Sequence, residues 1–137
     1  MTLIESNKEI IQEKNINIFL EDCFDWRDEL IFLDTEINFL KIIIISYSFE
    51  TSIPNLFEKI ELFISKFNAI LDAKNIICES IKKHQNMLEK MKTDKIIDSI
   101  KLLIEQHKNL ESKVFAFFTE YKNDKREFYD YMLSLIR

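Results

Sequence analysis

Between Ile16 and Tyr47, apolar residues recur at an alternating spacing of three and four positions along the chain. This spacing places them on one face of a long α-helix and is typical of helices that pack lengthwise against partner helices. We call this set the first seam, and its members are Ile16, Phe19, Cys23, Trp26, Leu30, Leu33, Ile37, Leu40, Ile44 and Tyr47. No catalytic motif lies on the first seam, so the seam predicts a helical architecture and indicates no reaction.

The 137 residues include no glycine and a single proline, Pro54. Hairpin turns, β-bulges and phosphate-binding loops depend on glycine. The absence of glycine therefore favours long helices with few connections. It also excludes the Gly-rich nucleotide-binding motifs. A length of 137 residues with 47 % hydrophobic content is enough for one domain with a buried core.

Two further seams follow the first, and the breaks between them set the expected helix boundaries. Thr51, Ser52 and Pro54 mark the first break, whereas Thr93 and Asp94 offer an N-cap and a first-turn acid for the last helix. The sequence therefore predicts an all-α, coiled-coil-like, antiparallel up-down bundle of three long helices in one domain, 1–137, with room for short extra helices at either terminus. The expected segments are an arm or short helix over 1–14 and helices over 15–48, 53–91 and 94–136. Asn15 or Asn17 would cap the first helix, and the polar stretch 122–127 leaves a kink in the last one open.

The two cysteines and two histidines are the candidate metal ligands. If the turns centre near residues 51 and 93, antiparallel helices bring Cys23 level with Cys78 and place the two histidines nearby. Zinc takes a Cys2His2 set tetrahedrally. The competing interpretation is that these residues are ordinary core positions, because cysteine is often fully buried. We expect no cofactor, with zinc or another transition metal bound by Cys23, Cys78, His84 and His107 as the alternative.

Acidic residues crowd the first expected helix. Asp22, Glu29 and Glu36 recur every seven residues and flank the first seam. Such flanking positions are where interhelical charge pairs set orientation and partner choice. Paired carboxylates for acid–base catalysis would need a pocket, which the pattern does not indicate, so we expect no enzyme.

The run Ile42-Ile43-Ile44-Ile45 points all the way round a helix, so one seam cannot bury it. Ile44 lies on the first seam, which leaves Ile42 and Ile45 to point outward. Either the N-terminal arm or another chain would cover them, because large exposed apolar patches usually mark contact sites. The residues expected in a self-association surface are Ile42, Ile43, Ile45, Phe128, Tyr129 and Met132.

Four short segments resemble small uncharacterised all-helical proteins of AT-rich bacteria. They are Trp26-Arg-Asp-Glu-Leu-Ile-Phe32, Glu36 to Leu40, Phe67-Asn68 and His84 to Leu88. The resemblance implies a helical bundle and carries over no activity, ligand or site residue.

A formal net charge of −5 argues against a nucleic-acid partner, which would need a basic surface. No basic segment leads into an apolar one at the N-terminus, and no apolar run approaches a membrane span, so we expect a cytoplasmic protein. The function expected is an interaction or scaffold module that self-associates. The alternatives are a small metal- or ligand-binding bundle, and an acidic inhibitor or immunity-type protein that masks a basic partner.

Overall fold

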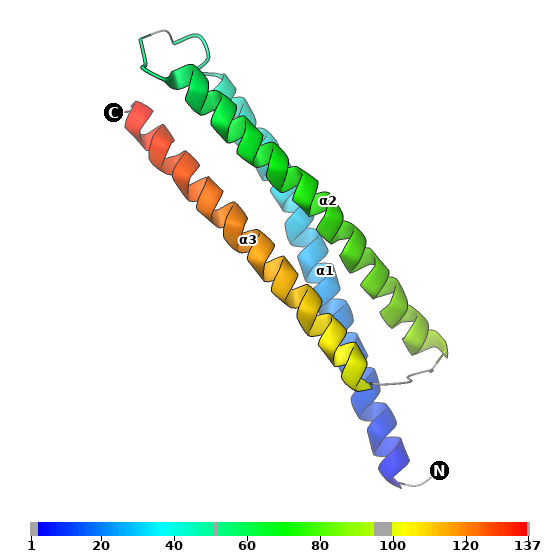
Figure 1. The fold of residues 1–137 in the computed structure, drawn as a ribbon. Helices are drawn as coiled ribbons and strands as arrows, with labels where there is room; N and C mark the ends of the chain where they lie inside the picture. The colour runs from blue at the N-terminus through cyan, green and yellow to red at the C-terminus, as the bar shows by residue number, and fades with distance from the viewer. Residues whose placement is uncertain (1–2, 51, 95–99, 137) are drawn as a thin grey trace. The chain divides into compact units, whose positions relative to one another are not determined.

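The computed structural model describes residues 3–50, 52–94 and 100–136, and the side chains among these from residue 13 onward. It contains three long helices, α1 (Leu3–Ile45), α2 (Leu56–Asp94) and α3 (Ile100–Ile136) (Figure 1). No strand occurs in these residues. The predicted all-α class with three long helices is confirmed. Among the described residues, none of the helices carries an apolar stretch of the length that a bilayer crossing requires.

The chain divides into two compact units, and every helix contributes a segment to each. Unit 1 comprises Met1–Glu29 with Ile77–Val114, and unit 2 comprises Leu30–Ile76 with Phe115–Arg137. The single domain over 1–137 stays a prediction, and the two units are described one at a time.

In unit 1, two side-chain contacts fix the direction of α2 along α1. Arg27 Nη1 donates to Gln85 Oε1 at 2.9 Å, and Lys92 Nζ donates to Asn17 Oδ1 at 2.7 Å. Residue numbers rise along α2 as they fall along α1, so the two segments are antiparallel. The apolar residues buried between the helices of this unit are Ile16, Leu20, Cys23, Ile81, Leu88, Leu103, Leu110 and Val114.

In unit 2, α1 and α2 are again antiparallel, because Lys74 pairs with Asp34 while Lys41 Nζ donates to Asn68 Oδ1 at 2.8 Å. The core contains an aromatic cluster in which the ring of Phe128 lies 5.5 Å from that of Phe63, edge to face. Phe67 lies 5.4 Å from the same ring. The first-seam residues buried in this unit are Leu30, Leu33, Ile37, Leu40 and Ile44.

The start of the first helix was predicted wrongly. α1 begins at Leu3 instead of near residue 15, so the expected arm or short helix over 1–14 belongs largely to α1. Asn17 does not cap the helix; its side-chain oxygen accepts from Lys92. An asparagine in a helix interior costs only a few tenths of a kcal/mol to ~0.7 kcal/mol relative to alanine. With no proline or glycine before it, nothing stops the helix there.

The first turn differs from the prediction by a few residues. α1 ends at Ile45 instead of residue 48, and tight turns follow, with Ser48 N–H donating to Ile45 O at 2.9 Å and Glu50 N–H to Tyr47 O at 3.0 Å. Asn55 stands directly before α2 with a φ of 59°, a left-handed conformation that asparagine tolerates better than most residues. Its carbonyl accepts the first helical hydrogen bond, from Lys59 N–H at 3.1 Å.

The second turn was placed too early. Thr93 and Asp94 belong to the last turn of α2 and do not cap the third helix. α3 is observed from Ile100, and residues 95–99 of the expected helix over 94–136 lie outside the described residues. The polar stretch 122–127 does not split this helix, since α3 continues through it to Ile136.

Candidate functional site

Unit 1 contains a buried pair of histidines, one from α2 and one from α3. His84 Nε2 lies 2.9 Å from His107 Nδ1, a hydrogen-bond distance. His84 and His107 are both buried, with only 8 % and 3 % of their surface exposed. Two of the four predicted metal-ligand candidates are therefore in direct contact.

Residues of α1 surround the second histidine. Phe19 and Trp26 stack on the His107 ring, with ring centroids 3.9 Å and 5.2 Å away. Asp22 lies between them in sequence, and its Oδ2 is 2.8 Å from His107 Nε2. The spacing of three and four residues puts these side chains on one face of α1. An ionised carboxylate only accepts hydrogen bonds, so His107 Nε2 donates to Asp22.

Burial controls the protonation of two neighbouring groups. Burial first, and repulsion from His107 second, lower the pKa of His84 to about 4, so His84 is neutral at pH 7. Burial, together with the charge of Asp22, raises the pKa of the Cys23 thiol to about 11. A thiol with so high a pKa is a poor nucleophile and a poor metal ligand until it loses its proton.

The predicted set of two cysteines and two histidines is not assembled. Arg27 contacts Gln85 and Asn17 contacts Lys92, so Cys23 lies level with the part of α2 between those two partners. Cys78 precedes Gln85 by seven residues, about 10 Å along the helix at 1.5 Å per residue. The error came from placing the first turn symmetrically about residue 51.

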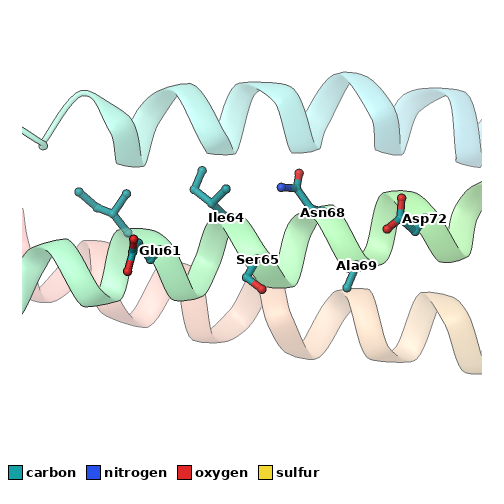
Figure 2. Close-up of a pocket in the computed structure, with 7 residues that line it drawn as sticks. Glu61, Ile64, Ser65, Asn68, Ala69 and Asp72 are labelled. Atoms are coloured by element: carbon teal, nitrogen blue, oxygen red, sulfur yellow. The ribbon is translucent and has the colours of Figure 1, made fainter.

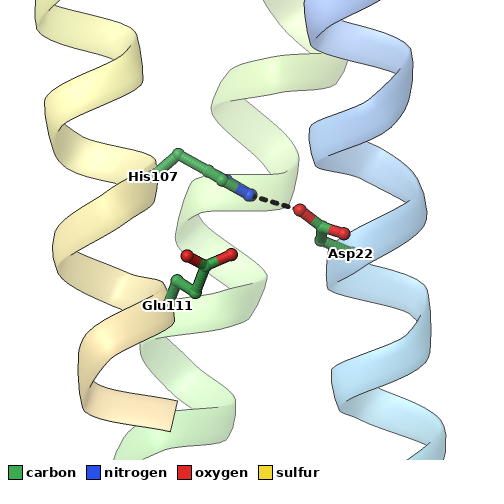
Figure 3. Close-up of side chains that lie close together, drawn as sticks. All are labelled: Asp22, His107 and Glu111. Atoms are coloured by element: carbon green, nitrogen blue, oxygen red, sulfur yellow. Dashed lines mark hydrogen bonds and ion pairs between the residues drawn. The ribbon is translucent and has the colours of Figure 1, made fainter. Parts of the chain in front are cut away.

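A different cluster forms around His107. One ligand atom each from Asp22, His107 and Glu111 lies within 4.8 Å of the others. Figure 3 shows Asp22 reaching from α1 toward His107 and Glu111 on α3, with the hydrogen bond to His107 dashed. Glu111 is exposed and makes no hydrogen bond or ion pair with another described residue. Sequence reasoning missed Asp22 and Glu111 as site residues, although the spacing of four between His107 and Glu111 was a visible signal.

The hollow in unit 2 lies along α2 and has a volume of about 600 Å³. Its lining residues all project from this one helix, with Ile64 and Asn68 on one side and Ser65 and Ala69 on the other (Figure 2). The acids at its ends, Glu61 and Asp72, are eleven residues apart, roughly 16 Å along the axis. They cannot act together on one substrate atom, so the hollow offers no acid–base pair.

The isoleucine run divides between core and surface. Ile44 is fully buried, whereas Ile42 and Ile45 are 68 % and 48 % exposed, and Ile43 is half-buried. No described segment covers Ile42 or Ile45. Phe128 and Met132 were wrongly placed in the expected surface, because both lie in the core of unit 2. Tyr129 is exposed on α3.

The exposed isoleucines belong to a second line of residues on α1, which we call the outer seam. Its members follow one another at spacings of four, three, four and three residues: Ile31, Thr35, Asn38, Ile42 and Ile45. All five are exposed, and Phe32 and Phe39 are exposed beside them. The five members of this line and the two phenylalanines are uncharged, and the charged side chain of Asp34, at their border, is 45 % exposed. The sequence contains this spacing, but only burial of the first seam shows that this face is left open.

Acids that flank the first seam are engaged within the protein. Asp22 accepts from His107, Asp34 pairs with Lys74, and Glu36 accepts from Tyr121 and from Lys125 Nζ at 2.9 Å. Glu29, which has the same heptad position as Asp22 and Glu36, is exposed. The heptad pattern of acids thus corresponds largely to contacts that hold α1 to its neighbours.

The chain matches no known protein-family model, no curated protein and no solved structure. The class of protein is therefore defined by its own architecture, an all-α protein of three long helices.

Proposed function

We propose that the protein is a non-enzymatic interaction module that self-associates, and that the outer seam of α1 is the contact surface. The observation that carries the proposal is the outer seam itself: a heptad line, exposed along its length and free of charge. Heptad seams pair with heptad seams on other helices. A second copy of the chain supplies one, so self-association needs no further partner.

The apolar area of this surface supports a specific contact. Ile31, Phe32, Phe39, Ile42 and Ile45 are between 48 % and 68 % exposed. A whole aromatic side chain buries roughly 150–250 Å²; if isoleucine is counted at the lower end of that range, these five partly exposed side chains present at most on the order of 600 Å². Two copies would bury up to about 1,200 Å² together if all five side chains were fully covered, which reaches the lower end of the range for specific interfaces.

The polar members of the outer seam favour a defined register. Thr35 and Asn38 lie between isoleucines, with Ile31 before them and Ile42 after them. A single asparagine in an apolar seam specifies register and oligomeric state, because its amide must find a hydrogen-bonding partner across the interface. Asn38 of one copy is therefore expected close to Asn38 of the second copy.

Charged residues at the borders of the outer seam do not oppose this pairing. On one border, Asp34 pairs with Lys74 and Lys41 donates to Asn68. On the other border, Glu36 accepts from residues of α3. These charges are directed to α2 and α3 within the same unit, so association does not leave them buried without a partner.

The double change Ile42→Lys with Ile45→Lys tests the proposal. Both side chains are exposed, so helicity by far-UV circular dichroism should be unchanged. Sedimentation equilibrium should show the wild type as a dimer or larger assembly and the variant as a monomer, because two lysines per copy would meet across the pairing surface.

The matched control is Phe57→Lys with Leu62→Lys, which places the same charges on exposed apolar positions of α2 in the same unit. It should associate like the wild type. A wild type that stays monomeric at millimolar concentration contradicts the proposal, and so does a control that dissociates as fully as the outer-seam variant.

A further inference from the structure

We infer that Asp22, His107 and Glu111 form a binding site for a divalent transition-metal ion such as Zn²⁺, and that His84 is a positioning residue for His107. These four residues belong to unit 1, whereas the outer seam belongs to unit 2. A failure of the metal-binding experiments would therefore leave the proposed self-association untouched, and a failure of the self-association experiments would leave the metal site untouched.

The ligand atoms are already gathered. Asp22 Oδ2 and His107 Nε2 are 2.8 Å apart, and all three candidate atoms lie within 4.8 Å of one another. Zinc binds nitrogen and carboxylate oxygen at about 2.0–2.2 Å, so its ligands surround it at mutual distances somewhat over 3 Å. Glu111 is exposed, and a change of side-chain rotamer can bring its carboxylate the remaining distance.

The helices α1 and α3 position the three ligand side chains. His107 and Glu111 are four residues apart on α3, so their side chains share one face of the helix. Phe19 and Trp26 stack on the imidazole of His107 and fix the plane of the ring. Asp22 comes from α1 and completes the set from the opposite side (Figure 3).

The second, independent observation is the partner of the other ring nitrogen. A histidine that binds a metal almost always donates its second N–H to a neighbouring acceptor, which fixes its tautomer and orientation. His84 Nε2 lies 2.9 Å from His107 Nδ1 and can be that acceptor. With a metal at Nε2, the one N–H that the His107 ring retains is at Nδ1 and donates to His84 Nε2, so His84 carries its own hydrogen on Nδ1.

The donor set selects the kind of ion. One imidazole with two carboxylates suits zinc and its first-row neighbours, whereas magnesium and calcium prefer oxygen ligands alone. Three protein ligands leave one tetrahedral position for water or a small ligand, as in open zinc sites. Asp22 is partly exposed and Glu111 is exposed, which gives an ion a path from solvent.

Calorimetric titration of the full chain with zinc chloride tests the site. We expect one ion per chain, and Glu111→Gln should weaken binding by at least about tenfold, because even loss of an outer partner costs 10–100-fold. Glu105→Gln, which removes the same charge from an exposed position of α3, should bind like the wild type. Both glutamates are exposed, so neither change should prevent folding.

The role of His84 is tested with Co²⁺, whose visible absorption reports coordination geometry. His84→Leu should weaken binding 10–100-fold and alter the spectrum, whereas His84→Gln should restore much of the affinity, because its side-chain oxygen can accept from His107 Nδ1.

Three results would overturn the site: no saturable zinc binding by the wild type, equal affinities for Glu111→Gln and Glu105→Gln, or loss of binding in Cys78→Ser. The last result would assign the ion to a thiol.

Discussion

Ile42 and Ile44 are two positions apart on α1, yet Ile44 has no exposed surface and Ile42 is 68 % exposed. Ile44 belongs to the part of the first seam that packs in the core of unit 2, and Ile42 belongs to the outer seam. The same helix is thus apolar on two faces, and its own neighbours cover only one of them.

Alanine substitution should separate these two faces by stability. Ile44→Ala should lower the free energy of unfolding by about 2–5 kcal/mol, because it removes buried methylene groups and leaves a cavity. Ile42→Ala should change it by no more than about 0.5 kcal/mol, the usual range for surface positions. Urea denaturation at low protein concentration, where association does not contribute, measures both. Equal losses would mean that Ile42 is buried by the protein itself.

The contacts of Glu36 predict part of the acid dependence of stability. Burial alone would raise its pKa, but hydrogen bonds from Tyr121 and Lys125 outweigh burial and hold the pKa below the ordinary value of 4.5. A lowered carboxyl pKa stabilises the folded state above pH 4.5, and this contribution is lost as the pH falls through the folded pKa. Glu36→Gln should therefore destabilise at pH 7 by about 1–3 kcal/mol and flatten the loss of stability below pH 4.5.

Exposed Glu29, on the same helix, provides the control for that measurement. Glu29→Gln should leave the pH profile of thermal unfolding close to that of the wild type. If the two variants shift the profile alike, the Glu36 contacts do not contribute to it.

The thiol of Cys23 should be almost unreactive in the folded protein. Its pKa is raised from 9.0 to about 11, so at pH 7 to 8 the thiolate fraction is about a hundredfold lower than for an ordinary thiol. Alkylation with iodoacetamide, followed by mass spectrometry of the cysteine peptides, should show Cys23 labelled at least that much more slowly than in urea-unfolded protein. Rapid labelling of Cys23 under native conditions would show that unit 1 opens readily.

The sequence predicted the helices and most of the core because burial follows the spacing of apolar residues. Nine of the ten first-seam positions lie on α1, and Tyr47 follows its end. Helix ends were less predictable. Asn17 looks like a cap in the sequence, but Lys92, a residue 75 positions away, binds its side chain.

The register between helices could not be obtained from the breaks alone. The connection between Ile45 and Leu56 begins with tight turns and ends with Asn55 in a left-handed conformation. The observed contact of Asn17 with Lys92 lies about seven residues farther along α2 than the assumption of a turn centred on residue 51 implies, and this offset misplaced Cys78 relative to Cys23. The same assumption had a smaller effect on the second turn, where His84 and His107 were expected near each other and are in contact.

The outer seam shows another kind of limit. Its spacing could have been counted in the sequence, but Ile42, Ile43 and Ile45 were instead grouped with Phe128, Tyr129 and Met132 in the expected self-association surface. The side chains of Phe128 and Met132 lie in the core of unit 2. Which of two apolar faces on a helix stays open depends on how many helices pack around it, and composition does not supply that number.

Cross-linking at Asn38 tests self-association through the outer seam most directly. In a Cys78→Ser background, Asn38→Cys places an exposed thiol at the middle of the outer seam. Paired helices lie about 8–10 Å apart, so a short bis-maleimide should convert this variant to a covalent dimer. Ser65→Cys, exposed on α2, should remain largely monomeric under the same conditions. Efficient dimer formation by Asn38→Cys that is abolished by adding Ile42→Lys and Ile45→Lys is the result we predict. Equal cross-linking of Asn38→Cys and Ser65→Cys, or none at either position, would contradict it.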